Sequence, residues 1–236
     1  CVYNGEHHMA MNRFIEVTLK LFLLGSFSLF ISGAGMFSAD SGELATDKNV
    51  KNNAPLAEIE GFRSAKFKMS MDQVKQAIYQ DFKLGDDKID TIKHPTEQTN
   101  SLAITVENLL PSSGKSRVVY VFGYKTKALI QVNILMGHPV DKDATPQQIV
   151  DSGNMLGNHF FNKRYQEDGL VKHARLSDGS VLIFRGKDQT GRMVLLRLSN
   201  PQPNAKKDDE LKISLTLSYI EKPEQPDMFK LKKDDF

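Results

Sequence analysis

The side chains that could bind a metal ion or transfer a proton are densest around two histidines. His159 and His173 flank Glu167 and Asp168, and imidazole and carboxylate groups are both ligands of zinc. This cluster indicates, as one alternative, a metal-dependent hydrolase that uses His159 and His173. The other interpretation is structural, because His159 falls at the end of an expected helix and Asp168-Gly169 is typical of a turn.

Motifs whose spacing is specific to catalysis are absent from the sequence. The chain has no phosphate-binding loop, no Gly-x-Ser-x-Gly elbow, no His-Glu-x-x-His helix and no paired cysteines. We therefore favour a non-catalytic protein without a cofactor or a bound metal. A small-molecule or lipid carrier is a further alternative.

The composition is that of an ordinary globular protein. The 236 residues include 31 Lys+Arg and 29 Asp+Glu, and 40% of them are hydrophobic. A net charge of +2, spread along the chain, argues against binding to nucleic acid, which favours clustered Lys and Arg. A chain of this length can bury a core without a disulfide or a metal, and Cys1 is its only cysteine.

The first residues have the order of an export signal. Arg13 and Lys20 precede the apolar run 21–31, and small residues follow it. This order predicts a signal peptide within residues 1–34, a mature chain that starts near Gly35, and a periplasmic or secreted protein. The other interpretation is an uncleaved membrane anchor, in which case the membrane is also a partner.

Two capping boxes predict the starts of two helices. In each box a hydroxyl side chain accepts from the third helical amide, while the Gln at that third position returns a bond to the cap. Ser70 with Gln73 forms the first box, and Thr145 with Gln148 forms the second. Apolar residues follow each box at helical spacing: Val74, Ala77, Ile78 and Phe82, then Ile149, Gly153, Leu156 and Phe160.

Several segments are typical of strands. Residues 102–106, 118–124, 130–136 and 211–219 place apolar side chains at every second position, and the apolar runs 181–184 and 193–198 lie in the second half. Short connections between the first three predict an antiparallel meander. Tyr120, Phe122 and Tyr124 form an aromatic row that suits either core packing or stacking on a sugar or base.

The two halves of the chain share a common offset. Ser70 and Thr145 are 75 residues apart, and so are Arg117 and Arg192. The sequence thus predicts an α+β fold, a tandem repeat of a helix packed on a three- to four-stranded antiparallel meander. The expected modules span 60–140 and 141–222, with a flexible leader at 35–59 and a mobile tail at 223–236.

One segment resembles a known family. Residues 67–78, Phe-Lys-Met-Ser-Met-Asp-Gln-Val-Lys-Gln-Ala-Ile, resemble the opening of SmpA/OmlA-type outer-membrane-assembly modules, and residues 61–67 look like the lead-in of uncharacterised proteobacterial exported proteins. The tandem layout resembles that of the β-lactamase inhibitory proteins, in which a concave sheet face holds a partner enzyme. The resemblance implies a fold and a binding habit, and it assigns no functional residue.

These observations predict an exported envelope protein that binds a partner through an open sheet face. If each helix covers one face of its sheet, the other face is left for another envelope protein or a cell-wall component. The residues that we expect on this face are polar and come from three strand segments: Gln131, Asn133, Arg192, Arg197, Thr216 and Ser218.

Overall fold

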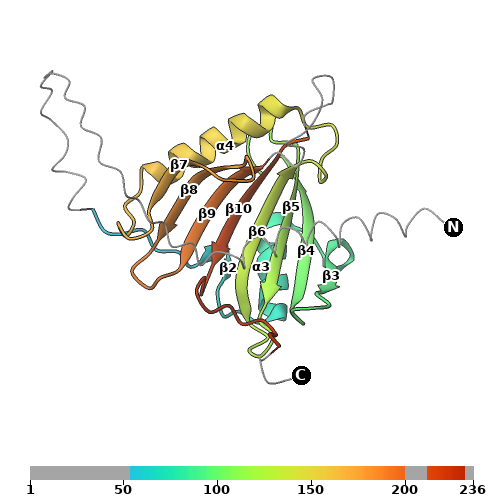
Figure 1. Ribbon diagram of the computed structural model, residues 1–236. Coiled ribbons are helices and arrows are strands. Elements are labelled where there is room, and N and C mark those ends of the chain that lie inside the picture. The colour runs from blue at the N-terminus through green and yellow to red at the C-terminus, as the bar shows by residue number, and fades with distance from the viewer. Residues whose placement is uncertain (1–53, 200–211, 232–236) are drawn as a thin grey trace, which may run out of the picture. The chain divides into compact units, whose positions relative to one another are not determined.

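The computed structural model describes residues 54–199 and 212–231, which all belong to one compact unit spanning 49–236 (Figure 1). The predicted export signal in residues 1–34 lies outside the described residues. The helices are α3 (Met71–Phe82), α4 (Pro146–Phe161) and the short 3-10 helix η1 (Asp86–Lys88). The strands are β1 (Gly61–Phe62), β2 (Ala65–Lys66), β3 (Asp90–Lys93), β4 (Asn100–Glu107), β5 (Lys115–Phe122), β6 (Leu129–Gly137), β7 (Val171–Arg175), β8 (Val181–Lys187), β9 (Met193–Ser199) and β10 (Ser214–Ile220).

The predicted tandem repeat of a helix packed on its own meander is wrong. Eight strands form one antiparallel sheet in the order β3-β4-β5-β6-β10-β9-β8-β7, beside a two-stranded β1-β2 sheet, so the fold is mostly β with two α-helices among the described residues. The reason lies in backbone pairing. Had the two meanders stayed separate, β6 and β10 would each have left a row of unpaired amides and carbonyls, and pairing them with each other removes both open edges.

Both α-helices begin where the capping boxes predict. The Ser70 amide donates to Gln73 Oε1 at 2.9 Å, and the Gln73 amide donates to Ser70 Oγ at 3.3 Å. Thr145 and Gln148 make the same two bonds at 2.8 and 3.3 Å. Helix α3 ends at Phe82, and Lys83, whose backbone is left-handed, forms its C-cap.

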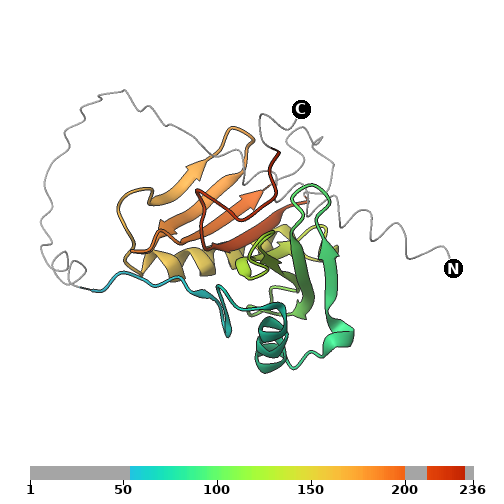
Figure 2. The same cartoon turned by 90° about the horizontal axis from the view of Figure 1, so that it is seen from below.

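One face of the large sheet forms the hydrophobic core, and the helices cover it. Residues of alternate positions in the central strands, such as Val132, Ile134, Leu215 and Leu217, belong to a single buried cluster with residues of both helices and of the β1-β2 hairpin. Helix α4 contacts β6, β8, β9 and β10, so it crosses the seam between the two meanders (Figures 1 and 2). We call this side of the sheet the core face.

Glycines allow α4 to lie close to the core face. A Cβ atom on Gly157 would stand 3.0 Å from Ile183 Cγ2, and one on Gly153 would stand 3.0 Å from Ile183 Cδ1. These distances are shorter than ordinary van der Waals contact. The Gly-x-x-x-Gly spacing in α4 therefore serves helix-to-sheet packing.

Residues after β10 run back across the end of the sheet and make specific contacts. The Glu221 amide donates to the Ile130 carbonyl, the Tyr124 amide to the Asp227 carbonyl, and the Phe229 amide to the Glu97 carbonyl. The described part of the expected mobile tail, 223–231, is therefore tied to the sheet. We call residues 221–231 the C-terminal strap.

Residues before β1 are also tied down. The Ile59 amide donates to Asp188 Oδ2 at 3.0 Å, and the Ala57 amide donates to the Arg164 carbonyl at 2.7 Å. The described end of the expected flexible leader thus forms part of the packed unit, and Ile59 is buried in the core.

Replacing Asp227 with Ala should release the C-terminal strap. The Asp227 carboxylate accepts from the Thr126 hydroxyl and from the amides of Lys125 and Thr126, and Ala removes all three bonds. Hydrogen exchange at neutral pH should then become faster at the Tyr124 and Phe229 amides. Gln225→Ala, an exposed change in the same strap, is the control, and equal exchange in both variants would contradict the anchoring role.

Acid should release the strap of the unmodified protein in the same way. Burial alone would raise the pKa of Asp227, but hydrogen bonds from Thr126 and Lys125 outweigh it and hold the pKa below 3.8. Because the folded pKa is depressed, the stabilisation is present at neutral pH and is lost as the pH falls through that lower value. Strap exchange, corrected for the intrinsic rate, should therefore increase only below about pH 4.

Overfilling the contact between α4 and the sheet should destabilise the fold. Gly157→Val places a branched side chain against Ile183 and Phe161, and such overpacking costs about 1–3 kcal/mol of unfolding free energy. Urea unfolding measures the change. The exposed neighbour Asn158→Val reports the effect of the β-branched residue alone, and an equal loss in both variants would show that packing is not the cause.

Candidate binding face

The opposite side of the large sheet carries a different set of side chains from the core face. Strand register places them in rows that cross the sheet, for example Val119, Asn133, Ser218 and Leu195 on β5, β6, β10 and β9. We call this side the reverse face. Its central members are Ser101, Ala103, Arg117, Val119, Val121, Gln131, Asn133, Leu135, Leu182, Met193, Leu195, Arg197, Thr216, Ser218 and Ile220.

A hydrogen-bonded polar group lies at the centre of the reverse face. Gln131 Nε2 donates to Asn133 Oδ1 at 2.8 Å, and Ser218 Oγ donates to the same oxygen at 2.7 Å across the β6-β10 seam. The three residues are at most 6% exposed. Because both bonds reach Oδ1, the Asn133 amide is held in one orientation, and its Nδ2 group donates to none of the described residues.

Two arginines on the reverse face are each held by an acidic side chain. Arg117 pairs with Asp90 and donates to Thr105 Oγ1 at 3.0 Å. Arg197 donates to Asp178 Oδ2 at 2.6 Å and to Ser180 Oγ at 3.0 Å. Both positive charges are thus compensated within the chain.

The interactions of Asp178 with Ser180 and Arg197 also change the pKa of Asp178. The Ser180 hydroxyl bond lowers the pKa of Asp178 most strongly, and Arg197 lowers it further, although partial burial opposes both. Asp178 therefore stays ionised at neutral pH and keeps Arg197 paired.

Five of the six residues predicted for the binding surface lie on the reverse face, and Arg192 does not. Gln131, Asn133, Thr216, Ser218 and Arg197 are neighbours there by register. The Arg192 guanidinium instead lies 5.7 Å from the Phe67 ring centroid and donates to the Ile59 carbonyl, which places it on the core side. Residues two positions apart in a strand share a face, so the spacing from the core residue Val194 could have indicated that Arg192 lies on the core side.

Apolar side chains make up much of the reverse face, and the sequence analysis did not assign them to a site. They are Ala103, Val119, Val121, Leu135, Leu182, Met193 and Ile220, each at most 8% exposed. None of them belongs to the core cluster, which lies on the other face together with the helices and the hairpin. These side chains are therefore already shielded from water within this chain.

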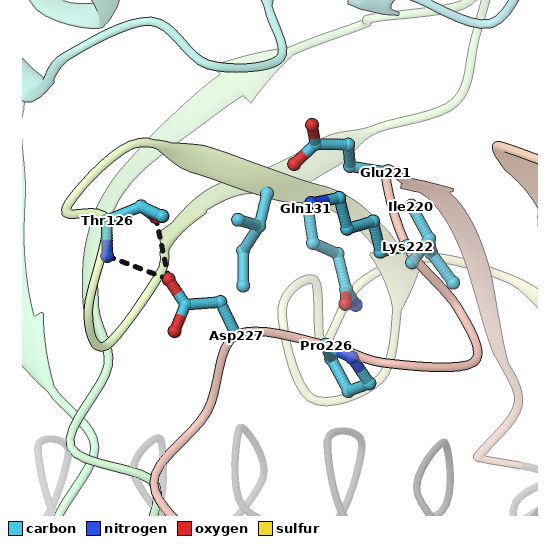
Figure 3. Close-up of a pocket in the computed structure, with 8 residues that line it drawn as sticks. Thr126, Gln131, Ile220, Glu221, Lys222, Pro226 and Asp227 are labelled. Atoms are coloured by element: carbon cyan, nitrogen blue, oxygen red, sulfur yellow. Dashed lines mark hydrogen bonds between the residues drawn. The ribbon is translucent and has the colours of Figure 1, made fainter. Parts of the chain in front are cut away.

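At the lower end of the reverse face the C-terminal strap encloses a small hollow (Figure 3). Gln131 and Ile220 line it from the sheet, and Pro226 and Asp227 line it from the strap. Water-sized molecules can occupy about 40 Å³ of it. A pocket for a small organic ligand is roughly 300 Å³ or larger, so this hollow does not favour the carrier alternative.

The two histidines of the metal alternative each pack beside a phenylalanine. The His159 ring lies 5.2 Å from the Phe160 ring, and the His173 ring lies 4.9 Å from the Phe161 ring, centroid to centroid. Burial, aided by Lys163, lowers the pKa of His159. Across 54–199 and 212–231, no group of three or more His, Cys, Asp or Glu side chains is placed to hold a metal ion.

The described helices are also too short or too polar to span a bilayer. None of those in the described part of the chain has both the length and the apolar character that a membrane-crossing helix needs.

Removing the central acceptor should destabilise the protein. Asn133→Ala leaves Gln131 and Ser218 buried without their shared partner, which should lower the free energy of unfolding by about 1–3 kcal/mol. In a double-mutant cycle measured by urea unfolding, Ser218→Ala should cost less in the Asn133→Ala background than alone. Strictly additive losses would show that the two side chains are not coupled.

Comparison with known protein families, with curated proteins and with solved structures finds no match for this chain. The resemblance to SmpA/OmlA-type modules therefore rests on the sequence residues quoted for it.

Proposed function

We propose that this protein is an exported, non-catalytic envelope protein that binds another protein or a cell-wall component through the reverse face. One observation carries the proposal. A sheet face opposite the core has apolar side chains around an ordered amide and hydroxyl group, and no described helix packs on it. The centre of a protein–protein interface has a similar composition, with apolar side chains around a few hydrogen-bonded polar groups.

The charge pattern of the reverse face supports the choice of partner class. Arg117 and Arg197, its two central arginines, are each paired with an aspartate. A nucleic acid needs many unpaired cations along its backbone, whereas these two arginines already have acidic partners. Arg185, which lies opposite Leu195 on the same face, donates to the Gly169 carbonyl and has no acidic partner among the described residues.

Export is supported by the sequence of residues 1–34. The basic, apolar and small-residue order there is that of a secretory signal, which supports a location in the periplasm or outside the cell. The remaining alternative for this segment is an uncleaved anchor. Mass spectrometry of the protein from its own cells distinguishes the two, because cleavage gives a chain that starts near Gly35.

A non-catalytic role is supported by the absence of spaced catalytic motifs in the sequence. The rival proposal, a metal-dependent hydrolase, requires His159 and His173 to share an ion. A stoichiometric metal in the purified protein that is lost in His159→Ala and His173→Ala would favour the rival.

A charge placed on the reverse face should abolish partner binding. Leu195→Lys puts an ammonium group beside Ser218 and opposite Arg185, where a bound partner would bury two cations without a counter-ion, so recovery of the co-purified partner should fall at least about tenfold. Met155→Lys makes the same change at a residue of α4 that is 43% exposed, and it should leave recovery unchanged. Equal recovery with both variants, each shown to be folded by circular dichroism, would refute the proposal.

A further inference from the structure

We propose that the turn between β5 and β6, residues 123–128, is a binding site for a carboxylate group. In the folded chain Asp227 of the C-terminal strap occupies this site as an internal ligand, and a carboxylate on another molecule displaces it and releases the strap. The inference concerns a turn and not the reverse face, so it does not rest on the proposed function. We call residues 123–128 the β5-β6 turn.

Hydrogen-bond donors of the β5-β6 turn converge on Asp227. The amides of Lys125 and Thr126 donate to the two carboxylate oxygens at 3.0 and 2.8 Å, and the Thr126 hydroxyl donates to one of them at 2.7 Å (Figure 3). The amide of the preceding residue, Tyr124, donates to the Asp227 carbonyl at 2.8 Å. Successive backbone amides that point to one place form an anion-binding concavity. The turn thus holds a carboxylate largely through its own backbone.

The charges of the β5-β6 turn favour an ionised ligand. Partial burial acts to raise the pKa of Asp227, but hydrogen bonds from Thr126 and Lys125 and the charge of Lys125 together bring it below 3.8. Lys127, whose ammonium lies 5.1 Å from the centre of the Tyr124 ring, adds a second positive charge to the turn. Hydrogen bonds to an ionised acceptor are stronger than those to a neutral one, so a carboxylate is preferred to an uncharged group.

Bonds within the β5-β6 turn itself fix its shape. The Gly123 amide donates to the Ala128 carbonyl at 2.9 Å, and the Lys127 amide donates to the Gly123 carbonyl at 3.1 Å. Gly123 also leaves room for the ligand, because a Cβ atom there would overlap Asp227 Oδ2 and crowd Thr126 Oγ1. The binding site is therefore formed locally and keeps its donors in place when the strap leaves.

The contact lies where another molecule can compete for it. Lys125, Thr126 and Lys127 are exposed, and the strap that carries Asp227 follows the last strand of the sheet. A ligand on the same chain has an effective concentration on the order of millimolar, which an external carboxylate must exceed. Asp227 thus acts as an autoinhibitory ligand of the turn.

NMR titration of the full-length protein tests the site. In Asp227→Ala, sodium acetate at constant ionic strength should shift the Lys125 and Thr126 amides until they saturate. The unmodified protein should need at least about tenfold more acetate for the same shifts, because Asp227 competes. Adding Gly123→Ala to Asp227→Ala should abolish the saturable shifts, since the new methyl group takes the place of the ligand oxygen. Adding Gly85→Ala, a matched change at a glycine with ordinary backbone (φ −85°), should preserve them.

A second titration identifies the chemistry and source of the ligand. An unlabelled peptide of residues 221–231 should bind the Asp227→Ala protein more tightly than acetate, because it also restores the backbone bond to the turn. In the unmodified protein this peptide should accelerate hydrogen exchange at the Phe229 amide of the strap. The same peptide with Asp227→Asn, and acetamide in place of acetate, should do neither.

The other outcomes overturn the inference. Absence of saturable shifts in Asp227→Ala, or equal saturation after Gly123→Ala is added in a folded protein, would refute the site. Equal binding of acetamide and acetate would refute the requirement for a carboxylate. Binding of the peptide without faster exchange at Phe229 in the unmodified protein would refute the displacement of Asp227.

Discussion

The pairing of β6 with β10 is the interaction on which the rest of the structure depends. It joins Gln131–Gly137 to Ser214–Ile220 residue by residue, and it turns two runs of four strands into one sheet. The seam has consequences on both sides. On the core face it forms one continuous surface, built from strands of both runs, on which α4 packs. On the reverse face it brings Ser218 to Asn133, so the polar centre exists only because the two strands are in this register.

The two faces of this sheet carry different kinds of side chain. Aromatic side chains gather on the core face, where Phe160, Tyr165 and Phe184 pack ring to ring beneath α4. The reverse face holds aliphatic groups, amides and hydroxyls, and its two central arginines, Arg117 and Arg197, are paired with aspartates. Hydrogen bonds on the reverse face also stabilise the sheet, because Gln131 and Ser218 share the Asn133 oxygen across the β6-β10 seam.

Sequence reasoning succeeded where the determining contacts are local and failed where they are distant. Ser70 and Thr145 mark helix starts because each capping box is complete within four residues. The joining of the two meanders depends on residues some 80 positions apart. No local pattern in β6 or β10 indicates that these two strands pair with each other. Strands β3 and β7 escaped notice because they are short and polar edge strands. Val119 and Val121 escaped notice because β5 is apolar at consecutive positions, and such a run does not show which of its two faces meets the core.

The position of β10 has a consequence for how the chain is completed. Among the described strands it is the last in the sequence, yet it occupies the middle of the sheet, between β6 and β9. Until residues 214–220 have been synthesised, β6 and β9 each have an unpaired edge. The backbone hydrogen bonds that join the two runs of strands cannot form before then. Such late closure means that the chain cannot complete its sheet until synthesis has reached residue 220. During this time the nascent chain has two unpaired strand edges that can aggregate, and chaperones that bind extended segments protect such edges.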